Sequence, residues 1–179
     1  MPITKTHFRA FSISCLLACV AGAAATEWIT FRSEPGHFTV RYPSTWNRYK
    51  DSPDLFEIEN FPPSKRLKGV VIPQGGAMII VLGAPRDTTT IENWIGARGE
   101  ALSKHEIRTL PQESGACTQL VEVESEGEEG PSTYTHETSF YCSTRTGLYR
   151  IELVNWRDDP KQEQLQQIAL KMALSLRSW

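Results

Sequence analysis

The chain has 179 residues, with 19 Lys and Arg against 21 Asp and Glu, so its formal net charge is −2 at pH 7. This length suits one domain with a short leader, and the mildly acidic balance excludes the basic surface expected of a nucleic-acid-binding protein. Beyond the leader, no apolar stretch approaches the roughly 20 residues that a membrane-spanning helix needs.

Residues 1–25 have the layout of a secretory signal peptide. Lys5 and Arg9 give a positively charged start, an apolar run follows at 11–20, and a series of small residues ends at Ala25. The apolar run is too short to span a bilayer, and the charge asymmetry argues against a buried helix. We therefore expect cleavage near Ala25 and export to the periplasm or the exterior of the cell.

A second interpretation of the leader concerns Cys19, because residues 16–19 resemble the cleavage box of bacterial lipoproteins. Acylation of Cys19 would add a peripheral membrane contact. Leu17 is an unusual residue inside such a box, and the residues after Cys19 stay apolar where lipoproteins begin a polar tether. We therefore favour ordinary cleavage, which leaves residues 26–179 as a single domain. Since the leader holds two of the 19 basic residues and none of the 21 acidic ones, this domain has a net charge of −4.

Alternating apolar residues predict the strands of this domain. Phe38, Val40 and Tyr42 share one face of a strand that we expect to be the central one. Pro43 ends it because proline cannot donate to a sheet ladder, and Trp46 folds back over the apolar face. The run at 77–82 is apolar on both faces, which indicates a strand covered on both sides. Further strands are predicted at 28–32, 54–61, 117–124, 134–142 and 148–156.

Two amphipathic segments predict helices. Thr89 and Glu92 form a capping box at the start of the first helix, and Asp159 and Pro160 begin the second. The apolar stripes of the two helices are Ile91, Trp94, Ile95 and Leu102, and Leu165, Ile168, Ala169, Met172 and Leu176. Leu170 and Leu174 lie on the other side of the second helix. A loop or the N-terminal strand could cover them, or they could face a partner, and we favour the interpretation without a partner. The fold class that follows is α+β, an antiparallel sheet flanked by helices.

Cys117 and Cys142 are predicted to form a disulfide. They are the two cysteines outside the leader, and export places them in an oxidising compartment. A hairpin register that sets Cys117 opposite Cys142 also sets Val121 opposite Thr138. A metal pair or a catalytic thiol is disfavoured because the sequence has no Cys-x-x-Cys and no histidine at ligand spacing from either cysteine.

The histidines and glycines of the domain give no support for catalytic, cofactor-binding or metal-binding residues. His37, His105 and His136 form no His-x-His or His-x-x-x-His pair, and the same hairpin register makes His136 a core residue opposite Val123. The Gly-x-Ser-x-Gly elbow of hydrolases is absent. The glycine pair at 75–76 precedes a strand, whereas a phosphate-binding loop precedes a helix.

Two charged segments are interpreted as solvated. The acidic run at 122–129 lacks the alternating Asp or Asn order of a calcium loop, so we expect an exposed hairpin tip. The basic run at 65–68 belongs to a segment, 62–76, that is rich in proline and glycine and reads as a long exposed loop.

Several of these segments, taken together, resemble the PsbP-like superfamily. The matching parts are the strand with Tyr-Pro-x-x-Trp at 38–46, the covered strand at 75–85, the start of the first helix at 90–94 and the end of the second at 174–177. The resemblance implies an α/β/α sandwich. Relatives include a lumenal extrinsic subunit of photosystem II, a nuclear import factor that binds a small GTPase, and bacterial envelope proteins. It therefore also implies a role in binding partners rather than in catalysis.

We expect a non-catalytic exported protein that binds a protein or membrane-protein partner in the cell envelope, with no cofactor. The alternatives are a small-ligand-binding or metal-binding module and a hydrolase-like enzyme without a recognisable motif. An apolar patch beside Leu170 and Leu174 would favour the protein partner. A dry pocket under the 62–76 loop would favour a small ligand, and a cavity flanked by His37, His136 and carboxylates would favour an enzyme.

Overall fold

The computed structural model describes residues 26–52, 55–62, 72–84, 88–97, 105–109, 116–126 and 135–179. The predicted leader with Cys19, most of the predicted long loop, Leu102 of the first helix and residues 127–129 of the acidic run lie outside the described residues. The signal peptide and its cleavage therefore stay predictions.

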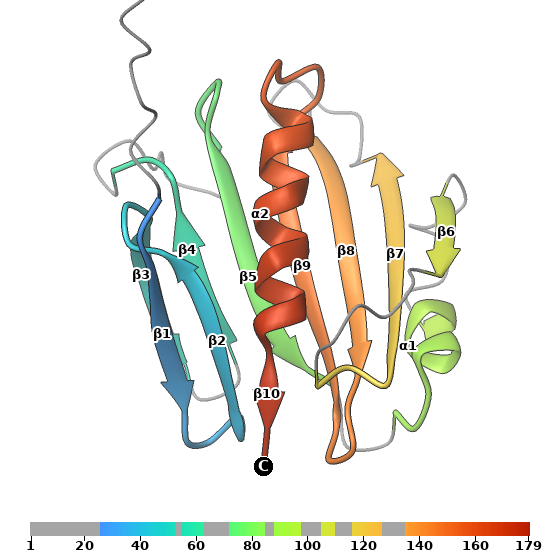
Figure 1. The fold of residues 1–179 in the computed structure, drawn as a ribbon. Helices are drawn as coiled ribbons and strands as arrows, with labels where there is room; N and C mark the ends of the chain where they lie inside the picture. The colour runs from blue at the N-terminus through green and yellow to red at the C-terminus, as the bar shows by residue number, and fades with distance from the viewer. Residues whose placement is uncertain are drawn as a thin grey trace, which may run out of the picture.

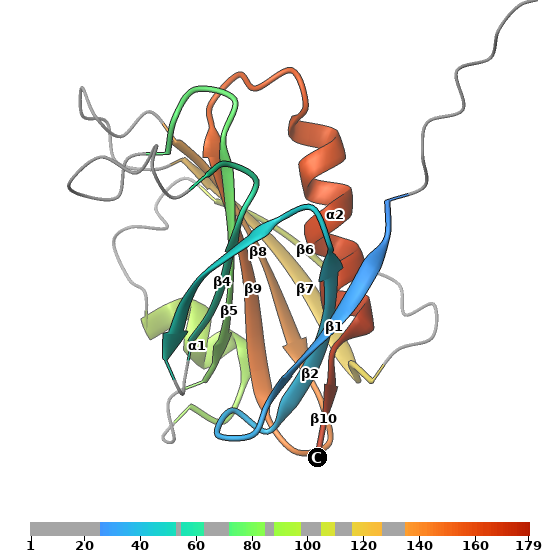
Figure 2. The same cartoon turned by 90° about the vertical axis from the view of Figure 1, so that its left-hand side faces the viewer.

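The described residues form two antiparallel sheets and two helices (Figure 1). The larger sheet has seven strands in the order β3 (Asn47–Ser52), β4 (Leu55–Glu59), β5 (Ala77–Gly83), β9 (Leu148–Trp156), β8 (Thr135–Ser143), β7 (Gln119–Glu126) and β6 (His105–Thr109). The smaller sheet has the order β1 (Trp28–Ser33), β2 (Phe38–Pro43) and β10 (Arg177–Ser178). Helices α1 (Ile91–Ala97) and α2 (Gln162–Ser175) lie on opposite sides of the larger sheet (Figure 2), which confirms the α+β prediction.

One face of the larger sheet is buried under α2 and the smaller sheet. In this core the apolar stripe of α2 and the inner face of β2 pack against β4, β5, β9 and β8. Its members include Phe38, Val40, Tyr42, Trp46, Phe56, Ile58, Ile79, Val81, Ile151, Leu153, Leu165, Ala169 and Met172. Leu170 and Leu174 are partly buried and pack against the same cluster, as does Trp28 of the N-terminal strand.

The predicted place of the Phe38–Tyr42 strand in the fold was wrong. β2 is the middle strand of the smaller sheet, and the centre of the larger sheet is held by β5, β9 and β8. Alternation shows which side of a strand is buried, but it carries no information about which strands are its neighbours. The prediction that Pro43 ends the strand and that Trp46 is buried is confirmed, since Trp46 is 8% exposed.

The opposite face of the larger sheet is covered in part by α1. Ile91, Trp94 and Ile95 are buried against β7 and β8, where the Trp94 and Tyr141 rings meet edge to face with centroids 5.4 Å apart. The cap of α1 differs from the prediction, because the backbone N–H of Asn93 donates to Thr90 Oγ1 at 3.1 Å. Thr90 is therefore the N-cap, one residue after the predicted Thr89.

The start of α2 also differs from the prediction. The helix begins at Gln162, because Asp159 closes a turn ahead of it by accepting a hydrogen bond from the Lys161 N–H at 2.8 Å. Asp158, with φ 61°, lies in the left-handed region and sets this turn. An Asp-Pro pair is typical of a turn as well as of a helix start, so the sequence alone did not separate the two.

The predicted disulfide is present between Cys117 and Cys142, with Cα atoms 5.3 Å apart, but the predicted hairpin register was wrong. Val121 pairs with Tyr141 and Val123 with Ser139, three residues away from the predicted partners. Cys117 precedes the first residue of β7, so the bridge does not join two facing residues of the ladder. Because the register differs from the predicted one by an odd number of residues, each side chain faces the opposite side of the sheet. Val121 and Val123 therefore pack under α1, away from the disulfide.

Three short strands escaped prediction. β3 and β6 are the outer strands of the larger sheet, and β10 adds two residues to the smaller one. Their sequences are polar and lack alternation, so nothing in them indicates a strand. His105, expected at the end of the first helix region, instead begins β6. Within the described residues, no helix has both the length and the apolar character that crossing a membrane requires.

We predict that removing the disulfide destabilises the fold. The bridge joins residues 25 apart, and closing a loop of that size stabilises the folded state by about 3.5 kcal/mol on the chain-entropy estimate. Urea unfolding of the double variant Cys117→Ala/Cys142→Ala, and of the reduced protein, should show a loss of this size. Equal unfolding midpoints with and without reductant would contradict the bridge.

Candidate binding site

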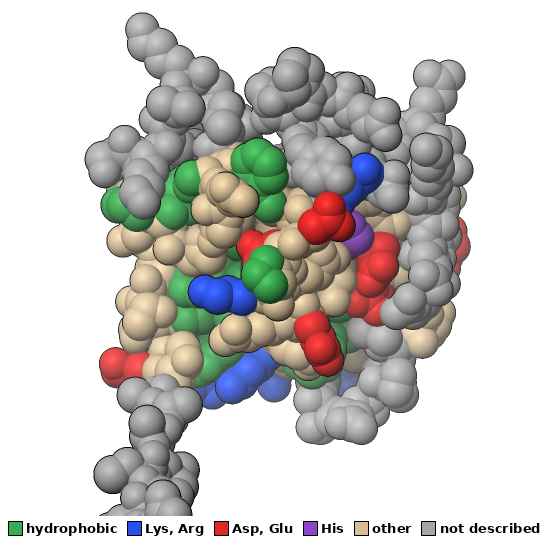
Figure 3. Space-filling view, turned by 90° about the horizontal axis from the view of Figure 1, so that it is seen from above, with side chains coloured by type: hydrophobic (Ala, Val, Ile, Leu, Met, Phe, Trp, Pro, Cys, Tyr) green, Lys and Arg blue, Asp and Glu red, His purple; other side chains and the backbone are tan. Residues whose placement is uncertain are grey.

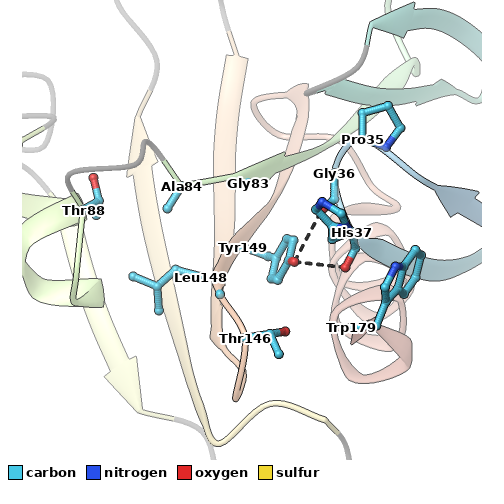
Figure 4. Close-up of a pocket in the computed structure, with 11 residues that line it drawn as sticks. Pro35, Gly36, His37, Gly83, Ala84, Thr88, Thr146, Leu148, Tyr149 and Trp179 are labelled. Carbon is cyan, nitrogen blue, oxygen red and sulfur yellow. Dashed lines mark hydrogen bonds between the residues drawn. The ribbon is translucent and has the colours of Figure 1, made fainter.

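A hollow of about 810 Å³ opens at the end of the molecule where the β1–β2 turn, the β8–β9 turn and the last residue of β5 come together (Figure 4). We call it the Tyr149 hollow. It is lined by Pro35–His37, Gly83–Ala84, Thr88, Thr146–Tyr149 and Trp179. These distant segments meet because β5 ends beside the start of β9, and β10 carries Trp179 alongside β2. The lining is a mixture of glycines, hydroxyl groups and aromatic rings.

Tyr149 ties the larger sheet to the β1–β2 turn. Its hydroxyl lies 3.3 Å from the carbonyl oxygen of Gly36 and 3.2 Å from that of His37, to which it donates, and its ring meets Phe38 at 5.6 Å between centroids. Burial raises the pKa of Tyr149, so the phenol keeps its proton at neutral pH. The turn is thus fixed relative to β9 by hydrogen bonds and by ring packing.

The β1–β2 turn has a geometry that depends on Gly36 and His37. A Cβ atom at Gly36 would lie 2.7 Å from the Phe38 ring, so only glycine permits this close approach. His37 has φ 51°, in the left-handed region that non-glycine residues rarely adopt. This conformation lets the His37 carbonyl accept both the Tyr149 hydroxyl and the Trp179 N–H, the latter at 3.3 Å.

Trp179 forms an aromatic wall of the hollow and is 41% exposed. The guanidinium carbon of Arg32 lies 3.9 Å from the centroid of the indole, and the His37 ring meets the indole edge to face at 6.3 Å. Arg32 also pairs with Glu34, and its hydrogen bond lowers the pKa of that carboxyl group. Trp179 is therefore exposed and yet held by contacts on its backbone and its ring.

A chain of hydroxyl groups runs behind the β8–β9 turn. Thr146 Oγ1 is 2.5 Å from Ser178 Oγ, Ser178 Oγ is 2.7 Å from Thr144 Oγ1, and Thr144 Oγ1 is 2.8 Å from the Gly147 carbonyl oxygen. Thr144 Oγ1 also accepts the N–H groups of Thr146 and Gly147 at 3.2 and 3.0 Å. These contacts tie the turn to β10 and orient Thr146 at the wall of the hollow.

Charged groups are buried on the α1 side of the larger sheet, away from the hollow. Arg150 and Glu152 form an ion pair at 2.7 Å with side chains only 10% and 8% exposed. Glu57 and Glu59 are also buried, at 5% and 0% exposure. Alternation along the strand predicted at 54–61 places them on the face opposite Phe56 and Ile58, but a sequence pattern cannot show that this second face is buried as well.

The structure brings only one of the predicted histidines into the hollow. His37 lines it, whereas His136 lies half-buried in β8 opposite Glu126 and Asn155, so its predicted place opposite Val123 was wrong. Among the described residues, no three His, Cys, Asp or Glu side chains gather closely enough to hold a metal ion. Glu124 is half-buried and accepts a hydrogen bond from Gln166 at 3.2 Å, so this part of the acidic run packs against α2.

Sequence reasoning missed the residues that form the hollow. Tyr149 fell within the strand predicted at 148–156, and neither it nor Thr146, Gly83 or Trp179 was predicted to belong to a site. The small-ligand alternative placed its cleft beside the 62–76 loop, but the described hollow is lined by other segments. In the sequence, only the tryptophan that follows the polar pair at 177–178 hints at a binding residue near the hollow. The pairing of residues 177–178 with β2, which brings Trp179 there, depends on tertiary structure.

The other end of the molecule has a mixed surface. Figure 3 looks onto it, and hydrophobic, basic and acidic described side chains are interspersed there.

No protein-family model matches the chain, and no curated protein matches it. Among solved structures, the chain is similar to a crystal structure from Bacteroides thetaiotaomicron VPI-5482, with 15% identity and a TM-score of 0.52 over 84% of this chain and 48% of that one. The chain thus spans about half the length of the Bacteroides chain, and this likeness shows the fold alone. The solution structure of cyanobacterial PsbP (CyanoP) from Synechocystis sp. PCC 6803 also matches, with 12% identity and a TM-score of 0.45 over 91% of this chain and 99% of that one.

We predict that the buried ion pair is sensitive to loss of one partner. Glu152→Leu leaves the Arg150 guanidinium buried without its carboxylate, which should cost about 3 kcal/mol of unfolding free energy. The double variant Arg150→Met/Glu152→Leu should lose less, because no buried charge remains. Urea unfolding measures both, and Glu34→Gln, in the exposed pair, should change stability little. Equal losses in the single and double variants would contradict this account of the pair.

Proposed function

We propose that this protein is exported to the periplasm or the exterior of the cell and acts there, without catalysis, by binding a protein partner in the cell envelope. The disulfide supports export, because cysteine pairs persist as disulfides in oxidising compartments. The expected leader supports it independently. Among the described residues that line the hollow there is one histidine and no carboxylate or thiol, so these residues offer no histidine–carboxylate or histidine–thiol pair for catalysis.

The outer edge of β1 is the feature that carries the proposal of a protein partner. β1 is the first strand of the β1-β2-β10 order, so no strand formed by the described residues pairs with its outer edge. Thr30 and Arg32 are exposed, and Ile29 is 37% exposed. Figure 2 shows β1 along the outside of the molecule. Such an edge presents backbone N–H and C=O groups to an extended segment of another protein, which adds to the sheet as a further strand.

β1 is held in place before any partner binds. The Phe31 ring stacks on Phe56 of the larger sheet at 4.2 Å, and Lys171 Nζ of α2 lies 4.4 Å from the centroid of the Trp28 ring. A strand fixed in this way loses little conformational freedom when a partner strand adds to it, which favours binding. The contacts leave the side chain of Ile29 partly exposed on the same strand.

We predict that a charge on the β1 edge weakens partner binding. Ile29→Lys places a lysine on the strand, a residue that natural edge strands use to block pairing with another chain. Affinity capture from the producing cell's envelope should recover the partner of the wild-type protein about tenfold less well with Ile29→Lys. Tyr49→Lys is the matched control, because Tyr49 is 43% exposed on β3, the outer strand of the other sheet. Equal recovery with both variants and the wild type would contradict a partner at β1.

A further inference from the structure

We propose that one outer face of the molecule docks on a membrane surface rich in anionic phospholipid. This face, which we call the basic face, consists of Arg32, Arg41, Lys171 and Arg177 together with Trp28 and Trp179. The proposal goes beyond the protein partner at β1, because it concerns the outer face of the smaller sheet, whereas that partner adds to the edge of the sheet. Two observations carry it: cations from four elements share one face, and two tryptophans flank them.

The smaller sheet directs one arginine outward from each of its three strands. The apolar residues of β2 alternate toward the core, so Thr39 and Arg41 point to the outer face. Arg32 of β1 and Arg177 of β10 both pair with Thr39, one on each side of it, and paired residues of a ladder share a face. The three arginines therefore project from the same side of the sheet, and all three are exposed.

Helix α2 extends this face with a fourth cation. The smaller sheet and α2 lie on the same side of the larger sheet (Figures 1 and 2). The backbone N–H of Arg41 donates to Ser175 Oγ at 2.8 Å, which holds the C-terminal part of α2 alongside β2. Lys171, one helical turn earlier, is exposed, and its Nζ lies 4.4 Å from the centroid of the Trp28 ring. By alternation Trp28 shares the outer face of β1 with Arg32, so Lys171 belongs to the basic face.

The basic face is positive although residues 26–179 together have a net charge of −4. Arg32 pairs with Glu34, but within the described part of the chain no carboxylate lies within ion-pair distance of Arg41, Lys171 or Arg177. Arg177 donates to backbone carbonyl groups at the end of α2, and these bonds fix its direction without removing its charge. Three cations on one side of an acidic domain attract an anionic surface and orient the molecule toward it.

The arrangement of the cations favours a layer of phosphate groups over a single acidic segment of a protein. Arg32 and Arg177 lie on either side of β2, so their backbones are roughly 10 Å apart, two strand spacings. Arg41 lies between these two strands, and Lys171 lies on the adjoining helix. An extended acidic peptide would align its carboxylates along one row, whereas headgroup phosphates are distributed in two dimensions as these cations are. Clusters of four or more Lys and Arg are typical of surfaces that bind anionic lipid.

The two tryptophans lie at opposite ends of the basic face, and each has a cation on its ring. Trp28 pairs with Pro43 at one end of the β1–β2 ladder, and the Trp179 N–H binds His37 at the other. Lys171 lies over Trp28, and the guanidinium carbon of Arg32 lies 3.9 Å from the centroid of the Trp179 indole. Trp179 is 41% exposed. Tryptophan is enriched at membrane interfaces because it has an apolar body and a polar N–H, so these rings suit the headgroup layer that the cations attract.

Co-sedimentation of the purified protein with lipid vesicles tests the proposal. Vesicles of phosphatidylcholine with about 30 mol% phosphatidylglycerol should bind the protein at least about tenfold more tightly than vesicles of phosphatidylcholine alone. Raising NaCl to about 0.5 M should remove most of this binding, because salt screens exposed charges. Equal binding to both kinds of vesicle would overturn the proposal. Soluble polyglutamate is the protein-like probe, and binding to it without binding to the anionic vesicles would assign the face to an acidic protein and overturn the membrane.

Matched charge reversals then locate the binding. Each Lys or Arg near an anionic membrane contributes about fivefold to partitioning, so Arg41→Glu should weaken binding to the anionic vesicles about tenfold or more. Arg145→Glu changes the net charge equally, but Arg145 is exposed in the β8–β9 turn of the larger sheet, and its loss should weaken binding less than about twofold. Equal losses in the two variants would show that overall charge governs binding and would overturn the assignment to the basic face.

A second reversal keeps the test decisive if Arg41→Glu does not fold. Lys171→Glu alters an exposed residue of α2 and should also weaken vesicle binding about tenfold. Unchanged binding in either folded variant would overturn the proposal. Ile29→Lys should bind the anionic vesicles at least as well as the wild type, and Arg41→Glu should still capture the protein partner. Failure at the β1 edge and failure at the basic face are therefore distinguishable.

Discussion

The contact between Tyr149 and the β1–β2 turn determines how the two sheets of this protein fit together at one end. A single phenol of β9 donates to two adjacent carbonyl groups of the turn, while its ring packs on Phe38. The same turn binds the Trp179 backbone through His37. Without this contact, the smaller sheet would still have its core packing, but the hollow and its tryptophan wall would have no fixed shape.

The strands and helices could be predicted where an element buries either one face or both faces. β9 was predicted with its observed bounds, and β2, β5 and β8 to within a residue or two, because their apolar residues follow a period of two or fill both faces. The hairpin register failed because a disulfide was taken as a facing pair, although Cys117 lies before β7 begins. The short polar strands β3, β6 and β10 owe their conformation to the neighbours they pair with, and a single sequence does not show those neighbours.

The hollow was beyond prediction for a related reason. Its lining is made of turn residues and strand ends, such as Gly83, Thr146 and His37, and their local sequence signals only a change of chain direction. The chain of hydroxyl groups beside the hollow depends on the contact of Ser178 with Thr144 and Thr146, which β10 brings to the β8–β9 turn. The predicted disulfide and the covered face of α2 were accessible from sequence because they depend on compartment chemistry and on helical periodicity.

The central claim is that Tyr149 joins the larger sheet to the β1–β2 turn and thereby shapes the hollow. Nuclear Overhauser spectroscopy on the labelled protein measures this most directly. The structure predicts cross-peaks between the ring protons of Tyr149 and Phe38, and between the Trp179 ring and the His37 ring. Absence of both contacts, with a solvent-exposed Tyr149 ring, would contradict the account.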